Sequence, residues 1–130
     1  MMTGKVVIVD DNRANLKLAR VVLSLEGLDV RTALSAEEAL TVLESFTPDL
    51  ILMDLQLPGI DGLQLTRQLK TDPARRDIII LAVTAYAMKG DMEKALAAGC
   101  DGYISKPFDP PMLCSLVQQH LQQKRPATCA

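Results

Sequence analysis

The sequence predicts an α/β domain in which a doubly wound sheet of five parallel strands is covered by five helices. Short apolar runs alternate five times with segments whose apolar residues recur at helical spacing. This alternation is typical of parallel strands joined by right-handed helical crossovers. The first run, residues 5–9 (KVVIV), is almost continuously apolar, as expected of a strand that is covered on both faces. At 130 residues, the chain is about one domain long.

The first strand and helix have clear boundaries. Residues 5–9 (KVVIV) form a β-branched run, which favours a strand. Asn12 is a suitable N-cap for a helix over residues 13–26, because its side chain can accept a hydrogen bond from a free amide of the first turn. Gly27 follows at the position where a glycine commonly ends a helix.

The second strand is expected at residues 28–33 and the second helix directly after it. Ser35 and Glu38 form a capping box, in which each side chain binds a free amide at the start of the helix. This helix should run to about Phe46, and Pro48 then breaks the chain.

The third unit combines an apolar strand at residues 50–53 (LILM) with a helix that starts near Gly62. The strand ends at Asp54. Leu65 and Leu69 lie four residues apart and therefore share one face of the helix.

The fourth strand, at residues 78–83, is the most hydrophobic run and ends at Thr84. A helix over residues 88–98 should follow and end at Gly99, before a short fifth strand at residues 102–105. The last helix begins after Asp109–Pro110, since proline fits the first helical turn. We expect the domain to cover residues 1–124 and a flexible C-terminal tail to cover residues 125–130.

Composition excludes several classes of protein. The formal net charge is −2, and the chain has no basic stripe of the kind that binds nucleic acid. Three widely spaced cysteines, Cys100, Cys114 and Cys129, indicate neither a disulfide framework nor a zinc site. No apolar run is long enough for a signal peptide or a membrane span, so we expect a cytoplasmic protein.

Polar side chains follow four of the five strands. Asp10 and Asp11 follow the first strand, Asp54 the third, Thr84 the fourth and Lys106 the fifth. In an open α/β sheet, ligands bind outside the carboxyl ends of the strands, so these side chains should meet at one edge.

This set of residues indicates phosphoryl transfer. Clustered carboxylates repel one another, and a hard divalent cation such as Mg2+ or Mn2+ would relieve the repulsion. The single histidine, His120, falls on the last helix, so the site has no histidine base. Asp54 is the best nucleophile and would form an acyl phosphate. Alternatively, Asp10 and Asp11 would only stabilise the start of the first helix.

The chain resembles the receiver domains of two-component response regulators from Val6 to about Leu121. The motifs that carry the resemblance are VDDN (residues 9–12), LMDLQLPGIDG (52–62), VTAYA (83–87) and YISKPF (103–108). The resemblance implies a flavodoxin-like fold with the strand order 2-1-3-4-5. The segment AYAMKGD (85–91) is most similar to standalone cell-cycle receivers and to receivers of hybrid kinases and phosphorelays.

The resemblance also implies a role for each site residue. Asp54 would be the phosphoacceptor, and Thr84 and Lys106 would bind the phosphoryl oxygens. Pro107 would hold a cis peptide that orients Lys106, and Tyr103 would be an aromatic switch that moves with Thr84. The implied metal ligands are Asp10, Asp11, Asp54 and the backbone carbonyl of Gln56.

The expected function is therefore that of a switch. A histidine kinase or a histidine phosphotransfer protein would donate the phosphoryl group. The face built by the fourth helix, fifth strand and fifth helix would then change shape and bind a protein target. We expect a monomer or weak dimer that catalyses only its own phosphorylation and dephosphorylation. Two alternatives stay open: a metal-dependent phosphatase or hydrolase on the same fold, and a pseudo-receiver that binds partners without taking phosphate.

Overall fold

The computed structural model describes residues 4–55, 62–84, 89–105 and 109–124. The strands are β1 (Lys5–Val9), β2 (Asp29–Ala33), β3 (Leu50–Asp54), β4 (Ile79–Thr84) and β5 (Gly102–Ser105). The helices are α1 (Arg13–Leu25), α2 (Ala36–Ser45), α3 (Gly62–Thr71), α4 (Lys89–Ala98) and α5 (Pro110–Lys124). Every predicted strand and helix is present, and the boundaries differ from the predicted ones by a residue or two. The predicted first residue of α4, Met88, lies outside the described residues.

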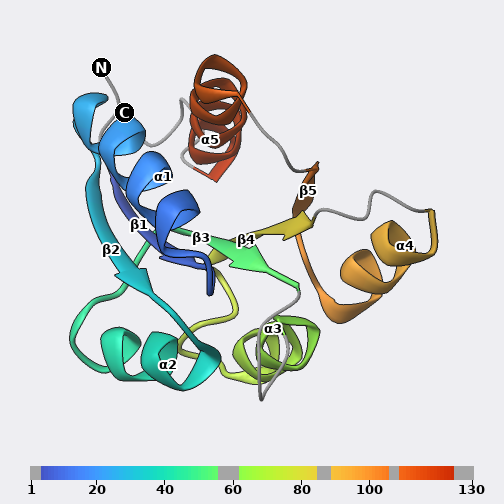
Figure 1. Cartoon of the computed structure of the whole chain (residues 1–130). Helices are drawn as coiled ribbons and strands as arrows, with labels where there is room; N and C mark the ends of the chain where they lie inside the picture. Colours follow the sequence, from blue (N-terminus) through green and yellow to red (C-terminus); the bar gives the residue numbers. More distant parts are fainter. Residues whose placement is uncertain (1–3, 56–61, 85–88, 106–108, 125–130) are drawn as a thin grey trace.

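The five strands form one parallel sheet in the order β2-β1-β3-β4-β5, as predicted (Figure 1). The strand β3 lies at the centre, between β1 and β4, and β2 and β5 are the two edge strands. Because the strands are parallel, all their carboxyl ends lie along the same edge of the sheet, and the side chains that follow them are brought together there.

The helices cover both faces of the sheet (Figure 1), α1 and α5 on one face and α2, α3 and α4 on the other. Alternate residues of each central strand point to opposite faces, so Ile51 and Met53 pack in one core while Leu50 and Leu52 pack in the other. All four side chains are at most 2% exposed. Burial on both faces explains why the three central strands, β1, β3 and β4, show no alternation of polar and apolar residues, whereas the edge strand β2 (DVRTA) does.

The helix boundaries follow from the capping residues that the sequence predicted. The Asn12 side chain accepts a hydrogen bond from the Asn15 amide (3.1 Å), and the Ser35 hydroxyl accepts one from the Glu38 amide (3.1 Å). Gly27 has a φ of 95°, a left-handed conformation that favours glycine. Within the described residues, no helix is both long and apolar enough to cross a bilayer.

Candidate functional site

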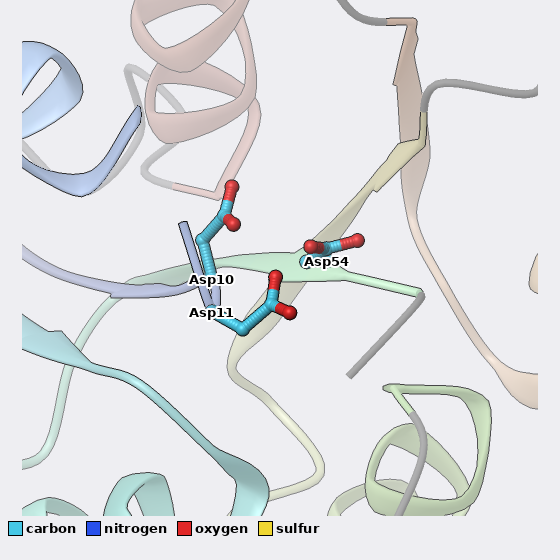
Figure 2. A group of neighbouring side chains, drawn as sticks. All are labelled: Asp10, Asp11 and Asp54. Carbon is cyan, nitrogen blue, oxygen red and sulfur yellow. The ribbon is translucent and has the colours of Figure 1, made fainter. Parts of the chain in front are cut away.

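Three aspartates from the ends of two neighbouring strands form the candidate site. Asp10 and Asp11 directly follow β1, and Asp54 is the last residue of β3 (Figure 2). One carboxylate oxygen from each of the three residues lies within 4.8 Å of the other two. Asp10 and Asp54 are buried, at 5% and 4% exposure, whereas Asp11 is exposed. The structure thus brings together all three carboxylates that the sequence predicted.

Backbone hydrogen bonds fix the position of Asp10. Its amide donates to the carbonyl of Ala33 (3.1 Å), which anchors it to the end of β2. Its Oδ1 accepts a hydrogen bond from the amide of Asn12 (2.9 Å), at the start of α1. The predicted alternative of a helix-capping role is therefore partly correct for Asp10. The same carboxylate also belongs to the acidic cluster, so the two roles coexist.

The residues at the ends of β4 and β5 continue the site along the sheet edge. Thr84 is the last residue of β4, is only 2% exposed, and lies opposite Ser105 at the end of β5. Tyr103 pairs with Ala82 and is half-buried against the core that faces α2, α3 and α4. The threonine is therefore next to the central strand that bears Asp54, and the tyrosine is on the edge strand beside it.

Three predicted site residues, Gln56, Lys106 and Pro107, lie outside the described residues. The backbone carbonyl of Gln56 as a metal ligand, Lys106 as a phosphoryl ligand and Pro107 as a cis proline therefore stay predictions. Leu55, the residue before Gln56, is described, and its amide donates to the carbonyl of Val83 (3.1 Å).

Sequence reasoning missed a close contact beneath Asp54. A Cβ atom on Gly62, the first residue of α3, would lie 2.3 Å from the backbone oxygen of Asp54 and 2.9 Å from the Cα of Leu55. One turn later, the buried Thr66 hydroxyl donates to the Gly62 carbonyl (2.7 Å). The sequence signal was a glycine at the first position of a helix, which had been interpreted only as a helix start. The structure shows that glycine is needed there because α3 begins against the backbone of the central strand.

The donor set fits a hard divalent cation. Carboxylate oxygens are the ligands that Mg2+ prefers, and opposite ligands of Mg2+ are about 4.2 Å apart. The 4.8 Å limit on the distances among the three carboxylates is comparable to this value. Asp10, Asp11 and Asp54 are the described residues that could hold the ion, with bound water as additional ligands.

Comparison with known proteins decides the family. Residues 6–118 match the response regulator receiver domain. The chain belongs to this family. A receiver domain is the phosphoacceptor module of two-component signal transduction, and the match confirms the function that the sequence predicted. Such domains bind Mg2+ at an acidic pocket, and they interact with phosphodonor kinases and with downstream targets.

Individual relatives support the same assignment over nearly the whole chain. The polar-differentiation response regulator DivK of Brucella ovis is 44% identical over 120 residues, which are 92% of this chain and 98% of the relative. A putative response regulator from Chloroflexus aurantiacus J-10-fl has a TM-score of 0.87 and 33% identity, covering 92% of this chain and 98% of that chain. A CheY-like receiver domain protein from Methanospirillum hungatei JF-1 has a TM-score of 0.88 and 31% identity, covering 95% and 98%.

Proposed function

We propose that this receiver domain takes a phosphoryl group from a phosphohistidine donor onto Asp54. The observation that carries the proposal is the cluster of three carboxylates, two of them buried, at the carboxyl ends of β1 and β3. Asp54 is the acceptor because it ends the central strand, where the backbone of β4 on one side and α3 beneath hold it in place. Asp10 and Asp11 serve as metal ligands, together with Asp54 and the backbone carbonyl of Gln56.

The transfer is an in-line displacement at phosphorus. A carboxylate oxygen of Asp54 attacks and forms the new P–O bond, while the bond from phosphorus to the donor's imidazole nitrogen breaks. The electron pair of that bond returns to the imidazole nitrogen, which takes up a proton. A divalent cation would supply charge neutralisation at the carboxylates and the incoming phosphoryl oxygens.

The phosphorylated aspartate carries about −1.5 to −2 charges and three new acceptor oxygens. In our proposal, the Thr84 hydroxyl and the Lys106 ammonium bind these oxygens, with the Lys106–Pro107 peptide orienting the lysine. Tyr103 then packs more deeply, since it is half-buried beside Ala82. The resulting change reshapes the surface of α4, β5 and α5, which binds the downstream protein.

The remaining features of the proposal concern the setting of the domain. Its partners are a histidine kinase or a histidine phosphotransfer protein on the donor side and a protein target on the output side. We place this exchange in the cytoplasm and assign the receiver domain to residues 1–124, as a monomer or weak dimer. The chemistry it catalyses is its own phosphorylation and dephosphorylation.

A metal-dependent hydrolase is less well supported. The family that residues 6–118 match is the receiver domain of response regulators, which supports a phosphoacceptor role over the hydrolysis of an external substrate. The pseudo-receiver alternative is disfavoured because Asp54, the proposed acceptor, is present and lies close to the carboxylates of Asp10 and Asp11.

Beryllofluoride with Mg2+, which mimics a phosphoryl group on a carboxylate, tests the assignment of Asp54. We expect it to shift the amide resonances of Thr84 and Tyr103 in the wild-type protein. Asp54→Asn should not respond, because it lacks the carboxylate oxygen that bonds to beryllium. Asp49→Asn is the matched control at the other end of β3, and it should respond as the wild type does. A full response in Asp54→Asn would disprove the assignment.

A further inference from the structure

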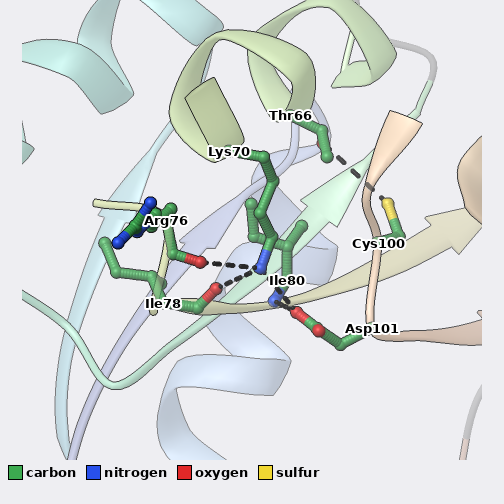
Figure 3. Close-up of polar contacts among 7 residues, drawn as sticks. All are labelled: Thr66, Lys70, Arg76, Ile78, Ile80, Cys100 and Asp101. Carbon is green, nitrogen blue, oxygen red and sulfur yellow. Dashed lines mark hydrogen bonds and ion pairs between the residues drawn. The ribbon is translucent and has the colours of Figure 1, made fainter. Parts of the chain in front are cut away.

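Lys70 makes several polar contacts at the amino edge of the sheet, which lies opposite the edge that carries the aspartates. Its Nζ donates to the carbonyls of Arg76 (3.2 Å) and Ile78 (2.8 Å) and to Oδ2 of Asp101 (2.9 Å), as Figure 3 shows. The side chain of Lys70 is only 19% exposed. Three acceptors around the ammonium of a largely buried side chain indicate a fixed position, in contrast to a mobile surface lysine.

Asp101 joins this lysine to the beginning of β4. The amide of Ile80 donates to the same Oδ2 of Asp101 (2.9 Å), and the amide of Asp101 donates to the carbonyl of Ile80 (2.7 Å). Asp101 and Ile80 are thus joined by two hydrogen bonds, one through the backbone and one through the side chain. This reciprocal pair lies one residue before β5 begins at Gly102.

The Asp101–Ile80 pair fixes how β5 is aligned with β4. From it the register continues to Tyr103 opposite Ala82 and Ser105 opposite Thr84. The strand β5 has four residues and lies at the edge of the sheet, so few ladder hydrogen bonds specify its alignment. A slip of one residue would turn Tyr103 to the opposite face of the sheet and move the end of β5 relative to Thr84.

The side chain of Lys70, on α3, also packs against the residue that follows α4. A Cβ atom on Gly99 would lie 2.8 Å from Cγ of Lys70, so the aliphatic part of the lysine packs directly on the α4–β5 connection. Next to it, the Sγ of Cys100 lies 3.9 Å from the Thr66 hydroxyl of α3 (Figure 3). The connection into β5 is therefore attached to α3 by two side chains one helical turn apart.

We propose that Lys70 and Asp101 are positioning residues for phosphoryl transfer, because they set the alignment of β5 and hence the placement of Tyr103 and of Ser105, which immediately precedes Lys106 in the sequence. Ser105, the residue before Lys106 in the sequence, is four residues from Asp101, about 13 Å along the strand at about 3.3 Å per residue. Asp101 accepts two hydrogen bonds through one oxygen, and Lys70 holds that oxygen in place. This inference depends on the proposed function for Lys106, whereas its structural part, the alignment of β5, does not.

The test compares Lys70→Met with the matched control Arg75→Met. Methionine retains the aliphatic part of the lysine that packs on Gly99 and removes the ammonium. Arg75→Met removes a neighbouring cation whose ion pair, with Asp72 (3.9 Å), does not involve β4 or β5. Lys70→Arg is the conservative variant, since it restores the charge and the donors. All variants are measured at a temperature at which circular dichroism shows them fully folded.

Two readouts separate positioning from stability. The first is the rate of phosphorylation by a small phosphoramidate donor at saturating Mg2+, together with the Mg2+ dissociation constant from calorimetry. In Lys70→Met we expect a rate about tenfold lower, because displacement of a catalytic group by less than about 1 Å already costs this much. The Mg2+ dissociation constant should be unchanged, because Asp10, Asp11 and Asp54 lie on other strands. Lys70→Arg should recover most of the rate, and Arg75→Met should match the wild type.

The second readout is amide hydrogen exchange, which requires no phosphorylation. In Lys70→Met, the amides of Tyr103 and Ser105, which face β4 as the Asp101 amide does, should exchange about tenfold faster, while that of Leu52 in β3 should not change. Should Lys70→Met fail to fold, Asp101→Asn serves instead, since it keeps a side-chain acceptor for Ile80 and removes the charge. Wild-type rates together with wild-type exchange in the folded variant would overturn the inference. If the wild-type protein itself takes no phosphoryl group, the proposed function fails. The exchange data alone then decide whether Lys70 and Asp101 set the alignment of β5.

Discussion

The carboxyl and amino edges of the sheet differ in how their charged groups are arranged. At the carboxyl edge, three carboxylate groups lie within 4.8 Å of one another, and two of them are buried. At the amino edge, the ammonium of Lys70 has an aspartate and two carbonyls as partners. Like charges in close contact destabilise a folded protein, whereas a well-bonded opposite pair is at least partly compensated.

This difference assigns different tasks to the two edges. In the proposed function a cation and a phosphoryl group bind at the carboxyl edge, and this role accounts for a cluster of like charges that costs stability. The amino edge holds the strands in alignment, and the alignment carries over to the carboxyl edge through the strands themselves. Substitutions that remove a charge should therefore differ between the two edges in the sign of their effect on stability.

The largest effect is expected for Gly62→Ala at the carboxyl edge. The added methyl group would lie 2.3 Å from the Asp54 carbonyl oxygen, and the backbone of a central strand cannot move aside. We expect the free energy of unfolding to fall by about 3 kcal/mol, measured by urea denaturation. Gly99→Ala at the amino edge is the control, and its loss should be smaller despite a φ of +109°, because the nearest atom there belongs to the flexible Lys70 side chain. Equal losses would mean that the two edges are equally rigid.

The second effect is expected for Lys70→Met at the amino edge. The substitution leaves the carbonyls of Arg76 and Ile78 and the carboxylate of Asp101 without the ammonium. The side chain of Asp101 is 41% exposed, so water will replace part of what is lost. We expect a decrease of about 2 kcal/mol in the free energy of unfolding. Arg31→Met removes the ion pair with Asp29, in which both side chains are exposed, and it should lower the free energy of unfolding much less.

The carboxyl edge could be predicted from the sequence, and the amino edge could not. Asp10, Asp11 and Asp54 were predicted to meet because each directly follows an apolar run, and parallel strands place such residues on one edge. Lys70 and Asp101 are separated by 31 residues and belong to different elements. No local pattern links them, since neither lies at the carboxyl end of a strand and each is typical of a solvated surface.

The close contact at Gly62 was missed for a similar reason. A glycine at the start of a helix has several local explanations, and only the packing of α3 against the backbone of β3 distinguishes among them. Capping at Asn12 and Ser35, in contrast, was predicted correctly because the donors and acceptors lie within three residues of each other. The sequence thus predicted short-range bonds and strand ends, while the contacts between elements required the structure.

The third effect should have the opposite sign. Asp11→Asn removes one charge from the acidic cluster without changing the size of the side chain. Without divalent cations and at low salt, we expect the free energy of unfolding to rise by about 1 kcal/mol. Salt at 1 M should shrink this gain, since Asp11 is exposed and its charge is screened. The gain should also reverse in saturating Mg2+, which stabilises the wild type by binding its native state. A loss of stability without Mg2+ would contradict the view of a repulsive carboxyl edge.

The smallest effect concerns Cys100, which lies beside Asp101 at the amino edge. Burial raises the pKa of its thiol above the ordinary value, a hydrogen bond with Thr66 opposes the shift, and nearby Asp101 adds to it. The native thiol therefore keeps its proton at a pH where the unfolded thiol, with a pKa of about 8.5, has begun to lose it. Its contribution to stability is fully present below about pH 8.5 and is lost as the pH rises toward the native pKa.

This linkage can be measured as a difference between two pH profiles. Between pH 7 and pH 9 the wild type should lose about 0.5 kcal/mol of unfolding free energy relative to Cys100→Ala. Cys114→Ala is the control: the pKa of Cys114 is also raised by burial, but its thiol is only half-buried, so the difference should be smaller. Parallel profiles for wild type and Cys100→Ala would show that the thiol titrates alike in the native and unfolded states. The core beside Lys70 and Asp101 would then admit water, and the description of the amino edge as a well-packed region would fail at that point.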